Sequence, residues 1–433
     1  MLKMPNLFSS NKFLIPLLFI LALMPRIATG IISGQVLSGD EVDYSQLASR
    51  ILEGKSYHSN FMLGFTNYRP PLYPLFIAVI YFFTDNSILA VKLAQALLGA
   101  FICSIVFFIA QGIFKDKRIS FGAAFIYAIY PSSILVGGSL LSETLLTFLL
   151  ALAIFFILRG YARPSLKNYL FSGIFLGLSA LTRPVILAFV PFLILWLAFF
   201  SSGNVLSRFK GVVFVILFMI LTIMPWTVRN YFVFKELVPI STGGGISVYV
   251  FNNEMILATI HDPLRPLGKT PLTDEQKKEI SLLSEPQRDK YLYKLGWEFA
   301  KSHPKEFFKI RLIVLSQFWH LWPESPARYR EYYSKEGAYR SPTLDKFAGT
   351  YLLYAVKILY HLPYNILFIG MFISLYISFK KGAEFRKSLL LIFLLIAMTL
   401  LYSICGEDRY RLPTDPYVFL LGIDGLLSFW KKK

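Results

Sequence analysis

Charged residues are scarce in this chain of 433 residues. Asp, Glu, Lys and Arg make up 16% of the sequence, whereas a typical soluble domain carries about 25%. Hydrophobic residues account for 55% and aromatic residues for 17%, and the mean hydropathy is +0.55. So little charge cannot cover a soluble surface, and so many aromatic residues exclude a disordered chain. The composition predicts an all-α protein that crosses a membrane several times.

Cysteines and the common catalytic signatures are also nearly absent. The two cysteines, Cys103 and Cys405, lie within or beside apolar runs, so the chain has no disulfide framework. The sequence holds no Walker-type phosphate loop, no dinucleotide-binding glycine motif, no His-Glu-x-x-His zinc motif and no nucleophile elbow. We therefore interpret the run Gly243-Gly244-Gly245 as a flexible turn rather than a phosphate loop.

Apolar runs of membrane-spanning length divide the chain, since a bilayer core takes about 20 apolar residues as one helix. We expect about ten transmembrane helices, at 13–32, 87–113, 119–136, 143–158, 168–182, 184–200, 211–228, 350–379, 388–404 and 413–430. The stretches 71–83 and 307–322 are shorter, which is typical of re-entrant or juxtamembrane helices. We expect three parts: an N-terminal catalytic module at 1–228, a small outer-face loop region with amphipathic helices at 229–349, and C-terminal transmembrane helices at 350–433.

An excess of positive charge orients these spans. The chain has 44 Lys plus Arg against 26 Asp plus Glu, a net charge of +18. In a membrane protein such an excess marks cytoplasmic loops and contacts with membrane lipid, so we expect no nucleic-acid partner. With both termini in the cytoplasm, seventeen Lys and Arg fall on the inner loops and tails and only six on the short outer loops. We therefore expect cytoplasmic termini, and the absence of N-x-[ST] accords with a bacterial inner membrane.

This orientation places the unusual polar clusters on the outer side. One is the acidic group Asp40, Glu41 and Asp43, which lies beside Tyr44 in the outer loop 33–70. Carboxylates so close together raise one another's pKa, which suits a general base near neutral pH. The alternatives are a solvated loop with a helix cap, or a divalent metal held by Glu41 with Asp43.

Further charged residues lie at the outer ends of apolar runs. A carboxylate among leucines is costly and usually functional, although Glu143 at a helix N-terminus is also satisfied by the helix dipole. Arg183 lies in a short turn, where its planar guanidinium suits a phosphate, and pairing with Glu143 is the alternative. Arg409 and Arg411 supply two more cations on the same side, or else form surface ion pairs with neighbouring acids.

Taken in order, these motifs resemble the GT-C glycosyltransferases, and most of all family 39, which holds the protein O-mannosyltransferases and the lipid A aminoarabinose transferases. The series consists of the acidic pair, Arg69-Pro70-Pro71, the outer glutamate, Thr182-Arg183-Pro184 and Arg409-Tyr410-Arg411-Leu412-Pro413. Each motif is short, so the specificity lies in an order that covers nearly the whole chain. The resemblance implies inverting transfer of a sugar from a polyprenyl-phosphate donor to an acceptor hydroxyl at the outer membrane face.

The resemblance also implies roles for single residues. Asp40 matches the family's base-like aspartate and Glu41 its acidic neighbour, and Glu143 stands where relatives often carry a second acid, usually Asp. Arg69 stands where they often carry Lys. The expected catalytic residues are thus Asp40, Glu41 and Glu143, the donor phosphate-binding residues are Arg69, Arg183, Arg409 and Arg411, and the further site candidates are Asp43, Tyr44, Tyr68 and Tyr410.

No cofactor is required in this interpretation, because fixed arginines can replace a metal. The expected partners are the polyprenyl-phosphate sugar donor, membrane lipid, and a lipid, glycan or protein acceptor. Residues 229–349 are few beside the accessory domains of some relatives, so the acceptor class stays open. Two alternatives stay open. A transporter or flippase of a lipid-linked sugar would use the same arginines but no base, and an outer-face glycan ligase or polymerase would use a polyprenyl-diphosphate donor.

Overall fold

The computed structural model describes residues 13–59, 65–254, 272–319, 350–379, 382–404 and 408–430. Every regular element in these ranges is a helix, and they contain no strand. The predicted all-α fold is confirmed. Cys405 and the last residues of the predicted helix 307–322 lie outside the described ranges.

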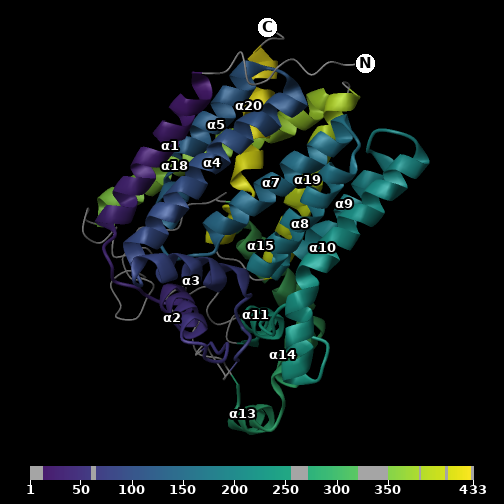
Figure 1. Ribbon diagram of the computed structural model, residues 1–433. Coiled ribbons are helices and arrows are strands. Elements are labelled where there is room, and N and C mark those ends of the chain that lie inside the picture. Colours follow the sequence, from purple (N-terminus) through teal and green to yellow (C-terminus); the bar gives the residue numbers. More distant parts are fainter. Residues whose placement is uncertain are drawn as a thin grey trace.

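A bundle of long helices forms the main body of the protein (Figure 1). Its helices are α1 (Leu14–Ile32), α4 (Ile88–Phe114), α5 (Lys117–Ile129), α6 (Pro131–Gly137), α7 (Glu143–Ala162), α8 (Leu166–Thr182), η2 (Pro184–Ala188), α9 (Phe189–Phe199), α10 (Val205–Phe234), α18 (Thr350–Ser378), α19 (Ala383–Tyr402) and α20 (Asp415–Trp430). Each predicted span coincides with one of these helices or with a consecutive pair. Helix α10 continues past the predicted boundary at residue 228.

Within the described residues, six helices are long and apolar enough to cross a membrane, and the pair α5–α6 would be a seventh span. The six are Leu14–Ile32, Ile88–Phe114, Glu143–Ala162, Val205–Phe234, His361–Ser378 and Ala383–Tyr402. The protein is therefore an integral membrane protein, as the composition predicts. The count of ten spans stays a prediction, because α8, α9 and α20 have only 17, 11 and 16 residues.

The predicted span 119–136 is broken, since α5 and α6 meet at a bend of 50°. Pro131 begins α6 and has no N–H to continue the hydrogen bonds of α5, so α5 ends before it. The carbonyl groups left at the end of α5 are satisfied by Arg26 of α1, which donates to Ala128 O at 2.8 Å and Tyr127 O at 3.1 Å. This buried arginine therefore fixes the turn that leads from α5 towards α7.

The interior of the bundle is apolar, and its surface is too. Phe107, Leu150 and Phe419 are fully buried in the core that α4 forms with α7 and α20, whereas α1 and α10 expose Ile20 and Ile220. Exposed apolar side chains of this kind face lipid, where helices associate through close packing and polar bonds.

Six more of the described helices gather at one end of the bundle (Figure 1), which we call the loop end. They are α2 (Asp40–Leu52), α3 (Leu72–Thr84), α11 (Gly244–Val250), α13 (Asp274–Ser281), α14 (Glu285–Ser302) and α15 (Pro304–Phe318). Helix α2 packs on α3, and α11 packs on α14. The predicted juxtamembrane helices 71–83 and 307–322 thus correspond to α3 and α15.

Candidate functional site

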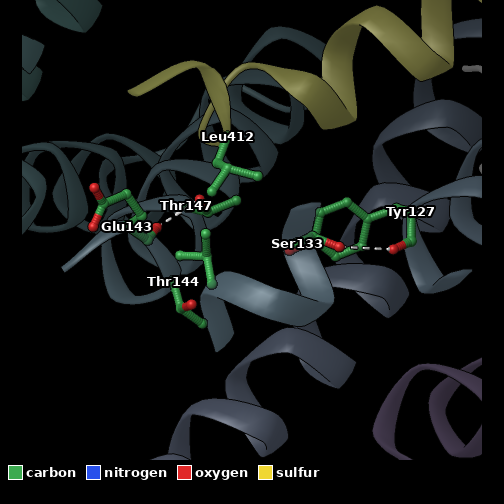
Figure 2. Close-up of a pocket in the computed structure, with 7 residues that line it drawn as sticks. Tyr127, Ser133, Glu143, Thr144, Thr147 and Leu412 are labelled. Carbon is green, nitrogen blue, oxygen red and sulfur yellow. Dashed lines mark hydrogen bonds between the residues drawn. The ribbon is translucent and has the colours of Figure 1, made fainter. Parts of the chain in front are cut away.

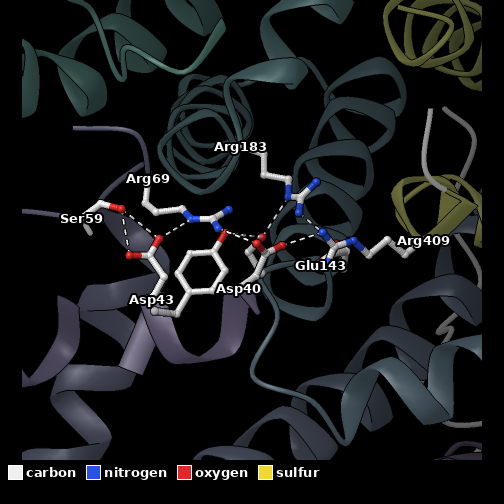
Figure 3. A network of polar contacts seen from close by, with 9 residues as sticks. Asp40, Asp43, Ser59, Arg69, Glu143, Arg183 and Arg409 are labelled. Carbon is white, nitrogen blue, oxygen red and sulfur yellow. Dashed lines mark hydrogen bonds and ion pairs between the residues drawn. The ribbon is translucent and has the colours of Figure 1, made fainter. Parts of the chain in front are cut away.

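Six charged side chains from separate parts of the sequence meet at the loop end and form one network of ion pairs (Figure 3), which we call the acid–arginine network. Its members come from α2, the loop before α3, the first turn of α7, the junction of α8 with η2, and the short helix η4 (Asp408–Arg411). They are Asp40, Asp43, Arg69, Glu143, Arg183 and Arg409.

Asp40 lies at the centre of the acid–arginine network, with a guanidinium on each side. Arg69 Nη2 lies 2.6 Å from its Oδ1, and Arg409 Nη2 lies 2.5 Å from its Oδ2. Burial raises the pKa of Asp40, but the two arginines outweigh burial and hold that pKa well below its usual range. The expectation that crowding raises this pKa is therefore wrong for Asp40, because its neighbours in space are cations.

Arg69 joins the two aspartates of α2. Its Nε lies 2.7 Å from Asp43 Oδ2, and Ser59 Oγ donates to Asp43 Oδ1 at 2.8 Å. The guanidinium carbon lies 4.8 Å from the ring centres of both Tyr44 and Tyr68. Such cation–π contacts, together with two ion pairs, fix the plane of the guanidinium. Arg69 therefore orients Asp40 and Asp43 relative to each other.

Glu143 and Arg183 pair with each other where the start of α7 meets the end of α8. Arg183 Nη2 lies 2.9 Å from Glu143 Oε1, and Arg409 Nε lies 3.6 Å from the same oxygen. Arg183 also donates to Ser142 Oγ at 2.9 Å, and its guanidinium carbon lies 4.4 Å from the ring centre of Tyr410. Glu143 is 1% exposed, and its Oε2 has no hydrogen-bond partner among the described residues. The alternative pairing expected for Arg183 is thus present, and its phosphate role stays a prediction.

Glu41 points away from the arginines, although it is adjacent to Asp40. Its Oε1 accepts from the N–H of Leu140 at 2.8 Å, and its Oε2 accepts from the N–H of Ser38 at 3.1 Å. Glu41 therefore connects the start of α2 to the turn before Glu143. Asp43 instead binds Ser59 and Arg69, so these contacts of the two carboxylates have no partner in common. No group of three or more His, Cys, Asp and Glu is placed to hold a metal ion within the described residues.

Arg411 belongs to a separate cluster inside the bundle. It is 1% exposed, its Nε lies 2.7 Å from Asp415 Oδ1, and its Nη2 donates to Tyr130 OH at 2.7 Å. Its guanidinium carbon lies 3.7 Å from the ring centre of Tyr364 in α18. Arg411 thus links α18, α20 and the junction of α5 with α6, whereas Arg409 joins the acid–arginine network. Asp415 was not among the predicted site residues, although its spacing of four residues from Arg411 is a signal for such a pair.

Glu143 also lines a small pocket in the bundle (Figure 2). It is lined by Tyr127, Ser133, Val136, Glu143, Thr144, Thr147 and Leu412. The hydroxyl of Ser133 donates to Tyr130 O at 2.9 Å, and that of Thr147 donates to Glu143 O at 2.7 Å. These hydroxyls stabilise the local backbone.

Known proteins match this chain in sequence and in structure. Residues 68–228 match the family model of dolichyl-phosphate-mannose-protein mannosyltransferases. The undecaprenyl phosphate-alpha-4-amino-4-deoxy-L-arabinose arabinosyl transferase of Wigglesworthia glossinidia brevipalpis is 22% identical over 168 residues, which are 38% of this chain and 30% of that protein. The matched range 68–228 holds Arg69, Glu143 and Arg183.

The archaeal oligosaccharyltransferase AglB from Archaeoglobus fulgidus, solved with an inhibitory peptide and a dolichol-phosphate, aligns over 98% of this chain and 51% of that chain. The TM-score is 0.56 and the sequence identity 15%. The apo crystal structure of the Archaeoglobus fulgidus oligosaccharyltransferase aligns with the same TM-score and coverage at 14% identity. This chain thus spans about half the length of the oligosaccharyltransferase. The bundle has the fold of the GT-C glycosyltransferases, and the resemblance to them that the order of the motifs predicts is confirmed.

Proposed function

We propose that this protein transfers a sugar from a polyprenyl-phosphate donor to an acceptor hydroxyl, with inversion at the sugar carbon, at the outer face of a bacterial inner membrane. The observation that carries the proposal is the acid–arginine network, in which three guanidiniums, each no more than 15% exposed in its side chain, and three carboxylates from distant segments meet at one end of the bundle. The bias of positive charge towards the opposite loops supports the outer placement, with both termini cytoplasmic.

The arginines provide the sites for a phosphate. When the bond between sugar and phosphate breaks, negative charge grows on the departing phosphate, and fixed guanidiniums stabilise that charge most strongly in the transition state. Arg183 and Arg409 both lie beside Glu143, and the ring of Tyr410 lies within 5.2 Å of each guanidinium carbon. We assign donor phosphate binding to these two residues, and we assign the orientation of Asp40 to Arg69.

Asp40 removes the proton from the acceptor hydroxyl in this proposal. In the network as it stands, Arg69 and Arg409 stabilise the charged form of Asp40, which makes it a weak base. A donor phosphate that binds Arg409 adds a negative charge beside Asp40 and competes for this guanidinium. Donor binding therefore strengthens the base at the time when it is needed. Arg411 stays with Asp415 and serves the fold.

The relatives support a lipid-linked donor. The matched family model is named for dolichyl-phosphate-mannose, the Wigglesworthia relative is named for an undecaprenyl phosphate sugar, and the AglB structure contains a dolichol-phosphate. We extend this donor class to the present chain, with a lipid, a glycan or a protein as the acceptor.

The test is a transfer assay with the purified protein in liposomes that contain undecaprenyl-phosphate-linked radiolabelled sugars and a membrane extract as the source of acceptors. We expect labelled product and free undecaprenyl phosphate from the wild type and from Glu53→Gln, whose side chain is exposed at the end of α2, but not from Asp40→Asn. Movement of the labelled lipid across the bilayer without any covalent product would instead identify a transporter.

A further inference from the structure

We propose that Glu285, in helix α14, is a positioning residue that holds Arg69 against Asp40 and Asp43, so that the acid–arginine network depends on the unit formed by α11 and α14. This inference rests on the proposed function for its kinetic consequence. Its structural part concerns the backbone of residues 65–70 and stands without that function.

The carboxylate of Glu285 is buried and bound by four donors. Its Oε2 accepts from Thr66 N–H at 2.8 Å and from Thr66 Oγ1 at 2.6 Å, and its Oε1 accepts from Asn67 N–H at 2.8 Å and from the hydroxyl of Thr242. Glu285 is 7% exposed. Hydrogen bonds to a carboxylate are roughly twice as strong as neutral ones, and a buried carboxylate without them is very costly. The contact therefore holds the segment 66–67 firmly to α14.

The segment so held leads directly into Arg69. Thr242 N–H donates to Asn67 O at 3.2 Å, and Asn67 Nδ2 donates to Ile240 O at 3.0 Å. On the other side, Tyr57 OH donates to Arg69 O at 2.9 Å. The backbone is thus fixed on both sides, and it cannot shift without moving the guanidinium that joins the two aspartates.

Glu285 is itself fixed at the start of α14. Ser284 is the N-cap and forms a capping box with Gln287, and Pro286 lies in the first turn. A carboxylate in the first turn of a helix is also stabilised by the helix dipole. The side chain of Glu285 therefore connects α14 rigidly to the backbone of residues 66–67.

The glycine run next to this connection is a packing seam, so its interpretation as a flexible turn is wrong. A Cβ atom on Gly245 would lie 2.0 Å from the carbonyl oxygen of Asp289 in α14, and one on Gly243 would lie 2.6 Å from the ring of Tyr68. Only glycine allows backbones to approach so closely. Gly245 N–H also donates to Asp289 Oδ1 at 2.7 Å. The start of α11 therefore packs closely against α14 through Gly245, and the preceding Gly243 packs against Tyr68.

Glu285→Gln replaces one carboxylate oxygen by an NH₂ group, which then faces an N–H or hydroxyl donor and cannot accept from it. We expect the 65–70 backbone to loosen and Arg69 to lose its fixed position. Misalignment of a reacting group costs rate, so kcat should fall by ~10- to 100-fold. The KM for the donor should change by less than about 3-fold, because Arg183 and Arg409 are untouched.

The experiment measures two quantities on full-length protein in detergent. Hydrogen–deuterium exchange of peptides covering 65–70 reports on the connection without any need for activity, and steady-state transfer reports kcat and KM. Glu298→Gln is the matched control, since Glu298 lies in the same helix with an exposed side chain. Thr242→Val removes one donor to Glu285 and should give a smaller change in the same direction. Glu285→Asp keeps the charge on a shorter side chain and should recover part of the rate.

Faster exchange at 65–70 with a selective loss of kcat in Glu285→Gln, and neither change in Glu298→Gln, supports the proposal. Unchanged exchange, or an equal loss in Glu298→Gln, overturns it. If Glu285→Gln does not fold, Thr242→Val decides by the same two measurements. If the wild type transfers no sugar, the proposed function fails, and the exchange result alone still decides whether Glu285 holds this segment.

Discussion

Two arginines that are two residues apart in the sequence have different surroundings in this protein. Arg409 reaches Asp40 and Glu143 at the loop end, where side chains from several helix ends and one loop converge. Arg411 is enclosed by Asp415, Tyr130 and Tyr364 inside the bundle. A short cationic motif can thus supply one residue to the site, Arg409, and one residue that stabilises the fold, Arg411. The ion pair of Arg411 with Asp415 fixes η4 to the start of α20, and this contact positions Arg409.

The largest effect on activity should come from Asp40→Asn. The amide cannot accept the proton of the acceptor hydroxyl, and general base catalysis contributes about 10²- to 10⁴-fold. We expect kcat to fall by about 1000-fold while undecaprenyl phosphate still binds. The measurement is transfer at saturating donor, and more than a tenth of wild-type kcat would remove Asp40 from the role of base.

Arg409→Gln and Arg411→Leu should separate the two arginines. Loss of a guanidinium from the phosphate should cost on the order of 2–4 kcal/mol, or ~30- to 1000-fold in kcat/KM, with little change in thermal stability. Arg411→Leu should instead lower the free energy of unfolding by about 3–5 kcal/mol, because Asp415 is left buried without its cation. Thermal unfolding and steady-state kinetics should be measured for both variants. The same loss of stability and of kcat/KM in both would show that the two arginines do not have different roles.

A paired substitution sharpens the same contrast. Arg411→Met with Asp415→Leu removes both charges from the interior, and well-packed apolar pairs often equal buried ion pairs in stability. We expect the double variant to regain most of the stability that Arg411→Leu loses, and to keep transfer activity. Glu143→Gln with Arg183→Gln should also regain stability but should stay inactive. An active form of this second double variant would show that Arg183 only neutralises Glu143.

The smallest effect concerns pH at the seam between α11 and α14. Burial raises the pKa of Asp289 to about 7, although the hydrogen bond from Gly245 opposes this. A carboxyl whose pKa is higher in the folded than in the unfolded state stabilises the fold when it is protonated, and this stabilisation is lost as pH rises from about 4 to about 7. Hydrogen exchange of α11, corrected for the intrinsic rate, should be slower at pH 6 than at pH 8. Asp289→Asn should remove most of that difference.

Much of the fold was predictable because lipid imposes long apolar helices, and each predicted span corresponds to a helix or a pair. The bend between α5 and α6 could be predicted from Pro131, a proline inside the predicted span 119–136. The side chain that stabilises this bend could not be predicted. Arg26 comes from α1, and its hydrogen bonds join residues about 100 positions apart. No pattern along the sequence carries such a contact.

Most residues of the site were predicted from the sequence, whereas most of the contacts between their side chains were not. Successive residues of a helix point about 100° apart, whereas residues three apart share a face. Once α2 is known to begin at Asp40, this spacing explains why Asp40 and Asp43 both meet Arg69 and why Glu41 turns to the backbone of Leu140. Glu285 was not predicted, because Thr66 and Asn67, whose backbone it binds, lie about 220 residues earlier in the chain.

The central claim is that the acid–arginine network binds a polyprenyl phosphate and that the Arg411 cluster does not. The most direct measurement is the affinity for undecaprenyl phosphate, determined by native mass spectrometry on purified protein. We predict that Arg183→Gln with Arg409→Gln abolishes saturable binding, and that Arg411→Met with Asp415→Leu retains the affinity of the wild type. Equal binding by all three proteins would contradict the claim.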